Sequence, residues 1–168
     1  MFKGTTILSV RTDKQVAMGG DGQVTFRDGN TVIKNQAKKI RRAYKDKILL
    51  GFAGASADAM LLFEKLEEKL ERYSGDLRRA CVELAKDWRH EKMLGKVEAM
   101  LVAANAEESF ILSGSGDVIV PDDGILAIGS GSSTALGAAR AMLKHTKLSA
   151  EEIVKDALLI TSEICIYT

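Results

Sequence analysis

Two adjacent threonines, Thr5 and Thr6, follow a short N-terminal segment and precede the apolar run Ile7–Val10. A threonine hydroxyl is a weak nucleophile until a base accepts its proton. The free α-amine of a chain-terminal threonine can be that base, since its unperturbed pKa of about 7.7–8.0 lies close to neutral pH. If Met1–Gly4 is removed, Thr5 therefore carries a nucleophile and its base on one residue. The alternative interpretation is the ordinary frayed start of a β-strand.

Two charged positions can assist such a threonine. Asp21, in the GGDG stretch at 19–22, ends the strand expected to pair with the first one, and an antiparallel hairpin brings it close to Thr5. If Lys38 or Lys39 points inward, its ammonium lowers the pKa of the amine, and Asp21 keeps that lysine charged. A glycine amide completes the set as an oxyanion hole. The alternative interpretation is an ordinary turn at Asp21 and an exposed basic patch at Lys38 and Lys39, which is the more common outcome on spacing alone.

The glycine-rich stretch GSGSSTALG follows an expected strand and precedes an expected helix. Such a loop can bind phosphate at a helix N-terminus. A dinucleotide fingerprint requires glycine at its sixth position, where this chain has Thr134, and a P-loop lysine is also missing. The stretch is therefore interpreted as a tight turn between strand and helix.

Composition excludes several classes of protein. The chain has 168 residues, 46% of them hydrophobic, which suits one domain with a real core. Its net charge of +1 gives no reason to expect a nucleic-acid partner, and its apolar runs are too short to span a membrane. Cys81 and Cys165 form no disulfide framework and are expected to be reduced, buried thiols. With no export signal, the expected location is the cytoplasm.

Turn signals and hydrophobic spacing divide the chain into two β-rich blocks, each followed by two helices. The first helix is expected to begin with Ser56 or Asp58 as its N-cap, and a capping box at 149–152 opens the last one. This order predicts the α+β class, as an antiparallel two-sheet sandwich with a helical layer on each outer face. Strands are expected at 6–10, 16–20, 24–26, 31–33, 48–53, 98–104, 110–112, 118–120, 125–128 and from 165, and helices at 56–75, 77–88, 134–144 and 150–164.

Several longer stretches resemble one protein family from end to end. They are TTILSVR, GGDGQVTF, NQAKKIRR, KILLGFAGASADAMLLFEKLEEKLE, CVELAKDWRHEKML, DDGILAIGSGSS, SAEEIVKDAL and ICIYT. The family is HslV (ClpQ), the proteolytic subunits of a bacterial ATP-dependent protease and relatives of proteasome β-subunits. The resemblance implies an N-terminal-nucleophile hydrolase fold, a four-layer αββα sandwich over residues 5–168, with residues 1–4 as a leader that maturation removes.

The same resemblance implies a threonine endopeptidase that degrades unfolded polypeptides inside two stacked six-membered rings. Its partner is HslU, a hexameric AAA+ unfoldase, and ATP is used by that partner rather than by this chain. No organic cofactor is implied, but a structural sodium ion is. The implied catalytic residues are Thr5, Lys39, Asp21, Gly51 (the oxyanion amide) and Ser130, and the implied sodium ligands are the backbone carbonyls of Ser162, Cys165 and Thr168.

This sequence departs from the family pattern at several points. Many relatives have threonine directly after the initiator methionine, relatives usually have glycine at the position of Ser162, and the turn at 27–29 is longer here. Relatives also usually continue beyond ICIYT. Two other functions remain open: a silent or precursor ring subunit, and a small-molecule amidohydrolase with the same N-terminal chemistry.

Overall fold

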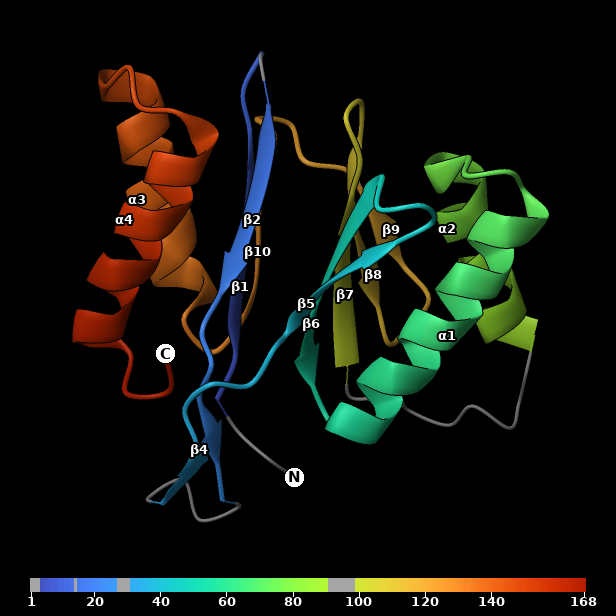
Figure 1. Cartoon of the computed structure of the whole chain (residues 1–168), viewed down its shortest axis with the longest axis horizontal. Coiled ribbons are helices and arrows are strands. Elements are labelled where there is room, and N and C mark those ends of the chain that lie inside the picture. Colours follow the sequence, from blue (N-terminus) through green and yellow to red (C-terminus); the bar gives the residue numbers. More distant parts are fainter. Residues whose placement is uncertain (1–3, 14, 27–30, 91–98) are drawn as a thin grey trace.

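The computed structural model describes residues 4–13, 15–26, 31–90 and 99–168. Within them the chain forms four layers, with a pair of helices on the outer face of each of two β-sheets (Figure 1). This arrangement confirms the predicted α+β class and the αββα sandwich. The expected turn at 27–30, the leader residues Met1–Lys3 and residue Glu98 lie outside the described residues.

The first sheet has the strand order β10-β1-β2, with β1 (Thr6–Arg11) between β2 (Val16–Gly20) and β10 (Ile125–Gly129). Both pairings are antiparallel, and Ile7 lies opposite Gly20 in the β1–β2 hairpin. Side chains alternate along β1: Leu8 and Val10 pack against helices, whereas Ile7 faces the other sheet. The central strand is therefore buried on both faces, as its apolar sequence predicts.

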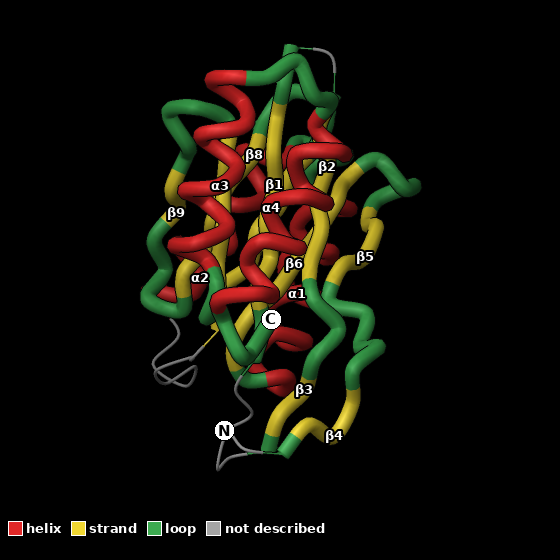
Figure 2. The backbone as a smooth tube through the Cα atoms, turned by 90° about the vertical axis from the view of Figure 1, so that its left-hand side faces the viewer, coloured by secondary structure: helices red, strands yellow, loops and turns green. Residues whose placement is uncertain are grey.

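Helices α3 (Ser132–His145) and α4 (Ala150–Ile164) cover the outer face of this sheet, in front of β1 in Figure 2. The predicted capping box of α4 is confirmed. The Ser149 hydroxyl accepts a hydrogen bond from the Glu152 N–H, and the Glu152 carboxylate accepts one from the Ser149 N–H at 2.8 Å. The α4 helix thus begins where the sequence places it.

The second sheet has the order β5-β6-β7-β8-β9, with every neighbouring pair antiparallel. Helices α1 (Ser56–Arg72) and α2 (Leu77–His90) cover it with a core that includes Leu66, Leu84 and the single tryptophan, Trp88. A separate hairpin of β3 (Val24–Thr25) and β4 (Val32–Lys34) extends beyond the sandwich (Figure 2). The strands of the second sheet are β5 (Ile40–Ala43), β6 (Ile48–Gly54), β7 (Ala99–Ala104), β8 (Ser109–Ser113) and β9 (Val118–Ile119).

The two sheets are fastened together at one end by Arg11. Its guanidinium donates hydrogen bonds to the carbonyls of Asn105, Ala106 and Glu108 and to the hydroxyl of Ser109, at 2.6–2.8 Å. Arg11 ends β1, and the other four residues belong to the β7–β8 turn or begin β8. At the opposite end of β1, where Thr5 lies, the connection between the sheets comes from Lys39, which directly precedes β5 and donates to the Gly4 carbonyl and the Asp21 carboxylate.

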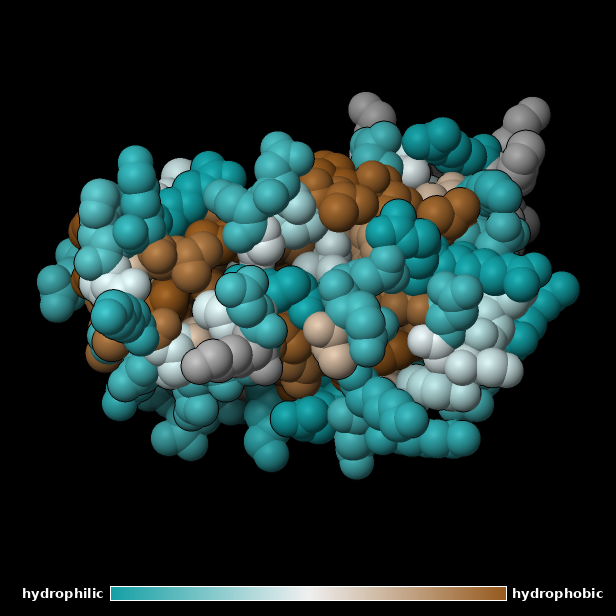
Figure 3. Space-filling view, turned by 90° about the horizontal axis from the view of Figure 1, so that it is seen from above, coloured by the Kyte–Doolittle hydropathy of each residue, from teal (hydrophilic) through white to brown (hydrophobic). Residues whose placement is uncertain are grey.

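The surface is mixed in character. Seen from above, hydrophilic residues make up most of the outline and hydrophobic ones form patches within the visible face (Figure 3). Large apolar side chains are also exposed on the C-terminal half of α4 and just after it, at Leu159, Ile160, Ile164 and Ile166. No helix among the described residues has the length and apolar character needed to cross a membrane.

Four details of the sequence-based prediction were wrong. Ile40–Ala43 forms β5, a strand that the sequence-based prediction omitted. The N-cap of α1 is Ala55, without a side-chain cap, rather than Ser56 or Asp58. The last four residues form a turn instead of a strand, because the Thr168 N–H bonds back to the Cys165 carbonyl at 3.0 Å. Cys165 is half-buried and not a core residue, whereas Cys81 is fully buried and both thiols are free.

Candidate active site

Thr5 lies immediately before β1, at the end of the strand opposite Arg11. Its carbonyl accepts hydrogen bonds from the Ser130 N–H at 2.7 Å and from the Ser130 hydroxyl at 3.1 Å. Ser130 directly follows β10, the antiparallel neighbour of β1, so the sheet itself brings these distant residues together. The Thr5 hydroxyl donates to the Gly4 carbonyl at 2.6 Å. Thr5 is therefore held by its backbone, with its side chain directed at the preceding peptide bond.

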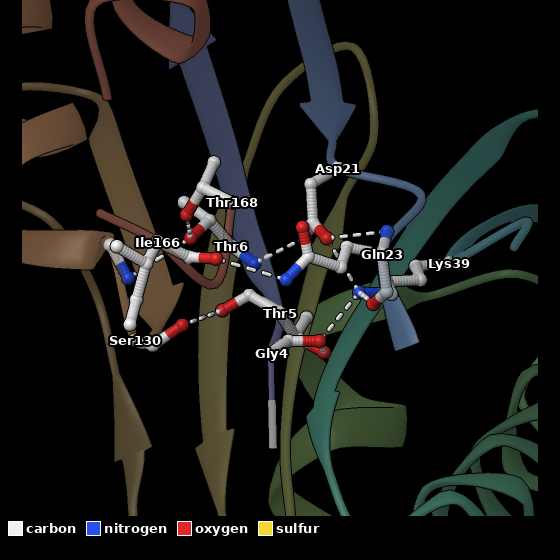
Figure 4. A network of polar contacts seen from close by, with 10 residues as sticks. Gly4, Thr5, Thr6, Asp21, Gln23, Lys39, Ser130, Ile166 and Thr168 are labelled. Atoms are coloured by element: carbon white, nitrogen blue, oxygen red, sulfur yellow. Dashed lines mark hydrogen bonds and ion pairs between the residues drawn. The ribbon is translucent and has the colours of Figure 1, made fainter. Parts of the chain in front are cut away.

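Asp21 lies beside Thr5, as the predicted β1–β2 hairpin requires. One carboxylate oxygen accepts from the Thr6 N–H at 2.6 Å. The other accepts from the Gln23 N–H and from the Lys39 ammonium, both at 2.8 Å. The carboxylate thus has three donors, two of them fixed by the backbone, and its orientation is fully determined by the fold (Figure 4).

Lys39 is the lysine that points inward, and Lys38 is exposed. Only 5% of the Lys39 side chain is exposed, and its ammonium donates to the Gly4 carbonyl at 2.7 Å, the Gln23 carbonyl at 2.5 Å and the Asp21 carboxylate. All three ammonium donors are therefore used. Burial lowers the pKa of Lys39 below its ordinary value, while the hydrogen bond and charge of Asp21 oppose that shift.

A small cavity of about 90 Å³ opens beside these groups. Gly4, Thr5 and Lys39 line one part of it, and Phe52 and Gly54 of β6 line another. Gly51, the predicted oxyanion residue, is not one of its lining residues. It lies within β6, opposite Ile40 and Val102 in the neighbouring strands.

Close packing between the sheets also requires glycine at position 51. A Cβ atom there would lie 2.6 Å from Ile7 and 2.9 Å from the sulfur of Met18. The glycine thus has a structural explanation independent of any catalytic amide.

The C-terminal turn contacts Thr6 and Gln23 beside the site, and sequence reasoning missed these contacts. The Thr168 hydroxyl lies 2.6 Å from that of Thr6, and the Thr6 hydroxyl also accepts from the Gly131 N–H at 2.9 Å. The Gln23 side chain donates to the Ile166 carbonyl at 3.0 Å. Gln23 and Thr6 were missed because each is an ordinary polar residue whose side-chain partners lie more than a hundred positions away in the sequence.

The three predicted sodium ligands lie at the end of α4 and in this turn. The Cys165 carbonyl accepts one hydrogen bond, from Thr168, which leaves it a second lone pair. Ser162 lies in the last turn of α4, where helix carbonyls lack intrahelical donors. Backbone oxygens of this kind suit a hard cation, so the residues present are compatible with such an ion.

Comparisons with known proteins place the chain in a family. Over residues 1–168 it matches the family described as "Proteasome subunit". It is 58% identical over 165 residues to the ATP-dependent protease subunit HslV of Syntrophobacter fumaroxidans (strain DSM 10017 / MPOB), an alignment that covers 98% of this chain and 91% of that protein. The chain belongs to the HslV branch of the proteasome family. The crystal structure of the eukaryotic HslV from Trypanosoma brucei has the same fold, with a TM-score of 0.89, 44% identity, and coverage of 97% of this chain and 93% of that one.

Membership of the HslV family agrees with the resemblance drawn from the sequence motifs. It accounts for the fold over the whole chain and identifies the chain as a proteasome-like protease subunit. The structure adds the arrangement of the site: Thr5, Asp21, Lys39 and Ser130 come together, and Gly51 lies one residue before the cavity wall.

Proposed function

We propose that this chain is the proteolytic subunit of a two-component ATP-dependent protease and that Thr5 is its nucleophile. The observation that carries the proposal is the buried Lys39 ammonium, which bonds to Asp21 and to the residue joined to Thr5. A buried, paired lysine beside a threonine near the chain start has little structural purpose of its own, since burying an ion pair is costly. Its value is the positive charge that it brings to Thr5.

In the proposed reaction, the free α-amine of Thr5 accepts the proton of the Thr5 hydroxyl as its oxygen attacks the substrate carbonyl. The Lys39 ammonium lowers the pKa of this amine, which keeps it unprotonated near neutral pH. The amine then returns the proton to the leaving nitrogen, which breaks the C–N bond and leaves an ester on Thr5. Water hydrolyses the ester. The family resemblance assigns oxyanion stabilisation to the Gly51 amide and a hydrogen bond at the Thr5 backbone to Ser130.

The four residues before Thr5 are removed before this chemistry begins, because an amide nitrogen cannot act as a base. The geometry supports cleavage by Thr5 itself. Its hydroxyl lies 2.6 Å from the Gly4 oxygen, and Lys39 donates to that same oxygen, where negative charge develops on attack. Gly4 has φ +109, and a Cβ there would lie 3.2 Å from Thr25, so glycine suits this position. The Thr5 hydroxyl oxygen attacks the Gly4 carbonyl carbon and forms an ester there, while the Gly4–Thr5 C–N bond breaks and the hydroxyl proton passes to the freed Thr5 nitrogen. Water then hydrolyses the ester and releases the leader as a carboxylic acid.

The proposed assembly is two stacked rings of six copies, with an AAA+ unfoldase of the HslU type that uses ATP and delivers unfolded polypeptides. The exposed apolar side chains at the end of α4 are consistent with contacts between copies. Both thiols are free among the described residues, which suits a cytoplasmic protein. A sodium ion is proposed on the carbonyls of Ser162, Cys165 and Thr168, where it would stiffen the turn next to the site.

Replacement of Thr5 tests the function. Thr5→Ala and Thr5→Val should abolish hydrolysis of a fluorogenic peptide, with and without the ATPase partner and ATP, and leave the assembled size unchanged in light scattering. Thr5→Ser should retain measurable activity because it keeps the hydroxyl. Thr12→Ala, which alters a threonine just beyond the other end of β1, is the matched control and should match the unaltered protein. Full activity in Thr5→Ala would refute the proposal.

A further inference from the structure

Gln23 connects three parts of the site through three different groups. Its backbone N–H donates to the Asp21 carboxylate at 2.8 Å, and its backbone carbonyl accepts from the Lys39 ammonium at 2.5 Å. Its side-chain amide donates to the Ile166 carbonyl at 3.0 Å. Figure 4 shows the residue between the lysine and the C-terminal turn. Gln23 therefore bonds to the aspartate, the lysine and that turn together.

The Gln23 carbonyl gains importance when the leader leaves. With the leader attached, the Lys39 ammonium has three acceptors: Gly4, Asp21 and Gln23. Cleavage before Thr5 removes the Gly4 carbonyl. Of the three protein acceptors described here, only the Asp21 carboxylate and the Gln23 carbonyl then remain to fix the ammonium beside the Thr5 amine.

The segment that carries this carbonyl is held by both backbone and side-chain hydrogen bonds. Residues 21–23 lie between β2 and β3, outside both strands. The Gly22 carbonyl is held by the Ala37 N–H at 2.9 Å, and Asp21 is held by Thr6. The Gln23 side chain provides a further anchor, which joins the segment to the C-terminal turn. The C-terminal turn is itself held to β1 by the contact between the Thr168 and Thr6 hydroxyls.

We propose that Gln23 is a positioning residue for the reaction. Its side-chain amide fastens to Ile166, and this keeps its own carbonyl on Lys39 and its N–H on Asp21. The proposal rests on the proposed function in one respect, that the Lys39 charge acts on the Thr5 amine. The C-terminal turn then influences the electrostatics of the site, because it binds the Gln23 side chain and the Gln23 carbonyl binds the Lys39 ammonium.

Gln23→Met tests the proposal, since methionine has a similar length and lacks the donor. We expect kcat to fall about three- to tenfold, the effect of one neutral hydrogen bond, with KM changed less than twofold. The range of pH over which the variant is active should become narrower at both its acid and its alkaline limit. A displaced ammonium lowers the Thr5 amine pKa less, so the acid limb moves to higher pH, and a lysine with a weaker acceptor loses its proton at lower pH, so the alkaline limb moves down.

Gln15→Met is the matched control, because Gln15 is exposed at the far end of the β1–β2 hairpin. Gln23→Ala removes the same donor with less bulk and carries the same expectation if the methionine variant folds poorly. An unchanged kcat, or a lower thermal stability with both pH limbs unmoved, would overturn the proposal and leave Gln23 a purely structural residue. Failure of this proposal can be told apart from failure of the proposed function, because only the latter predicts peptide hydrolysis by Thr5→Ala.

Discussion

Lys39→Met removes the charge that the site is built around, and the structure indicates how much this costs. The Lys39 and Asp21 side chains are only 5% and 6% exposed, so the variant leaves a buried carboxylate without its cation. Removal of one partner from a buried ion pair typically costs about 3–5 kcal/mol. A cost near the lower end of this range is expected for Lys39→Met, because the N–H groups of Thr6 and Gln23 still donate to the Asp21 carboxylate. A loss of about 3 kcal/mol lowers the folding equilibrium constant roughly 100-fold.

Denaturant unfolding measures this cost directly. The fluorescence of Trp88, the single tryptophan, reports on the α2 layer and therefore on global unfolding rather than on the site. Measurements at one protein concentration keep any contribution of assembly constant. Lys38→Met is the stability control, since this exposed neighbour should change the unfolding free energy by less than about 0.5 kcal/mol.

A double-mutant cycle with Asp21→Asn separates the ion pair from general damage. Each single variant leaves one buried charge unpaired, whereas the double variant leaves none. The double variant should therefore cost about 1–3 kcal/mol less than the sum of the single ones. Peptide hydrolysis should fall at least about 100-fold in Lys39→Met and should not return in the double variant. Additive costs, or a loss under about 1 kcal/mol with activity retained, would refute the reasoning.

Three further outcomes follow from the same structure. Asp21→Asn removes the negative charge that opposes the lowering of the Lys39 pKa by burial and weakens the hydrogen bond that does the same. The alkaline limb of the kcat/KM pH profile should therefore move to lower pH, and an unmoved limb would count against the Asp21–Lys39 pairing. Gly51→Ala introduces a methyl group into contact with side chains of β1 and β2 and should cost about 1–3 kcal/mol; an unchanged Tm would contradict this close packing. Ser149→Ala should cost about 1 kcal/mol at neutral pH. The Ser149 backbone and hydroxyl lower the Glu152 pKa below its ordinary 4.5, so the deficit should shrink as the pH falls through that lowered pKa, and a deficit independent of pH would argue against the capping box.

Features set by neighbouring residues were predictable from the sequence. The β1–β2 hairpin follows from two short apolar runs around a polar turn, and it alone places Asp21 next to Thr5. The capping box at Ser149 is likewise a local pattern, and it appears as predicted. These elements need no knowledge of the other sheet.

Features set by contacts between layers were not predictable in this way. The choice between Lys38 and Lys39 depends on which one faces the first sheet, and spacing leaves both possible. Strand β5 was missed because its two arginines are exposed on an edge strand, so its sequence does not alternate as a buried strand does. Residues 165–168 look like a strand locally, but contacts with Gln23 and Thr6 hold them as a turn.

The central claim is that the working enzyme begins with a threonine whose backbone nitrogen is free. The most direct measurement is the intact mass of the assembled protein, taken on the same sample that is assayed for peptide hydrolysis. The account predicts that activity rises with the fraction of chains that begin at Thr5, and that chains beginning at Met1 contribute none. A preparation composed entirely of chains that begin at Met1 and hydrolyses peptides at the full rate would contradict it.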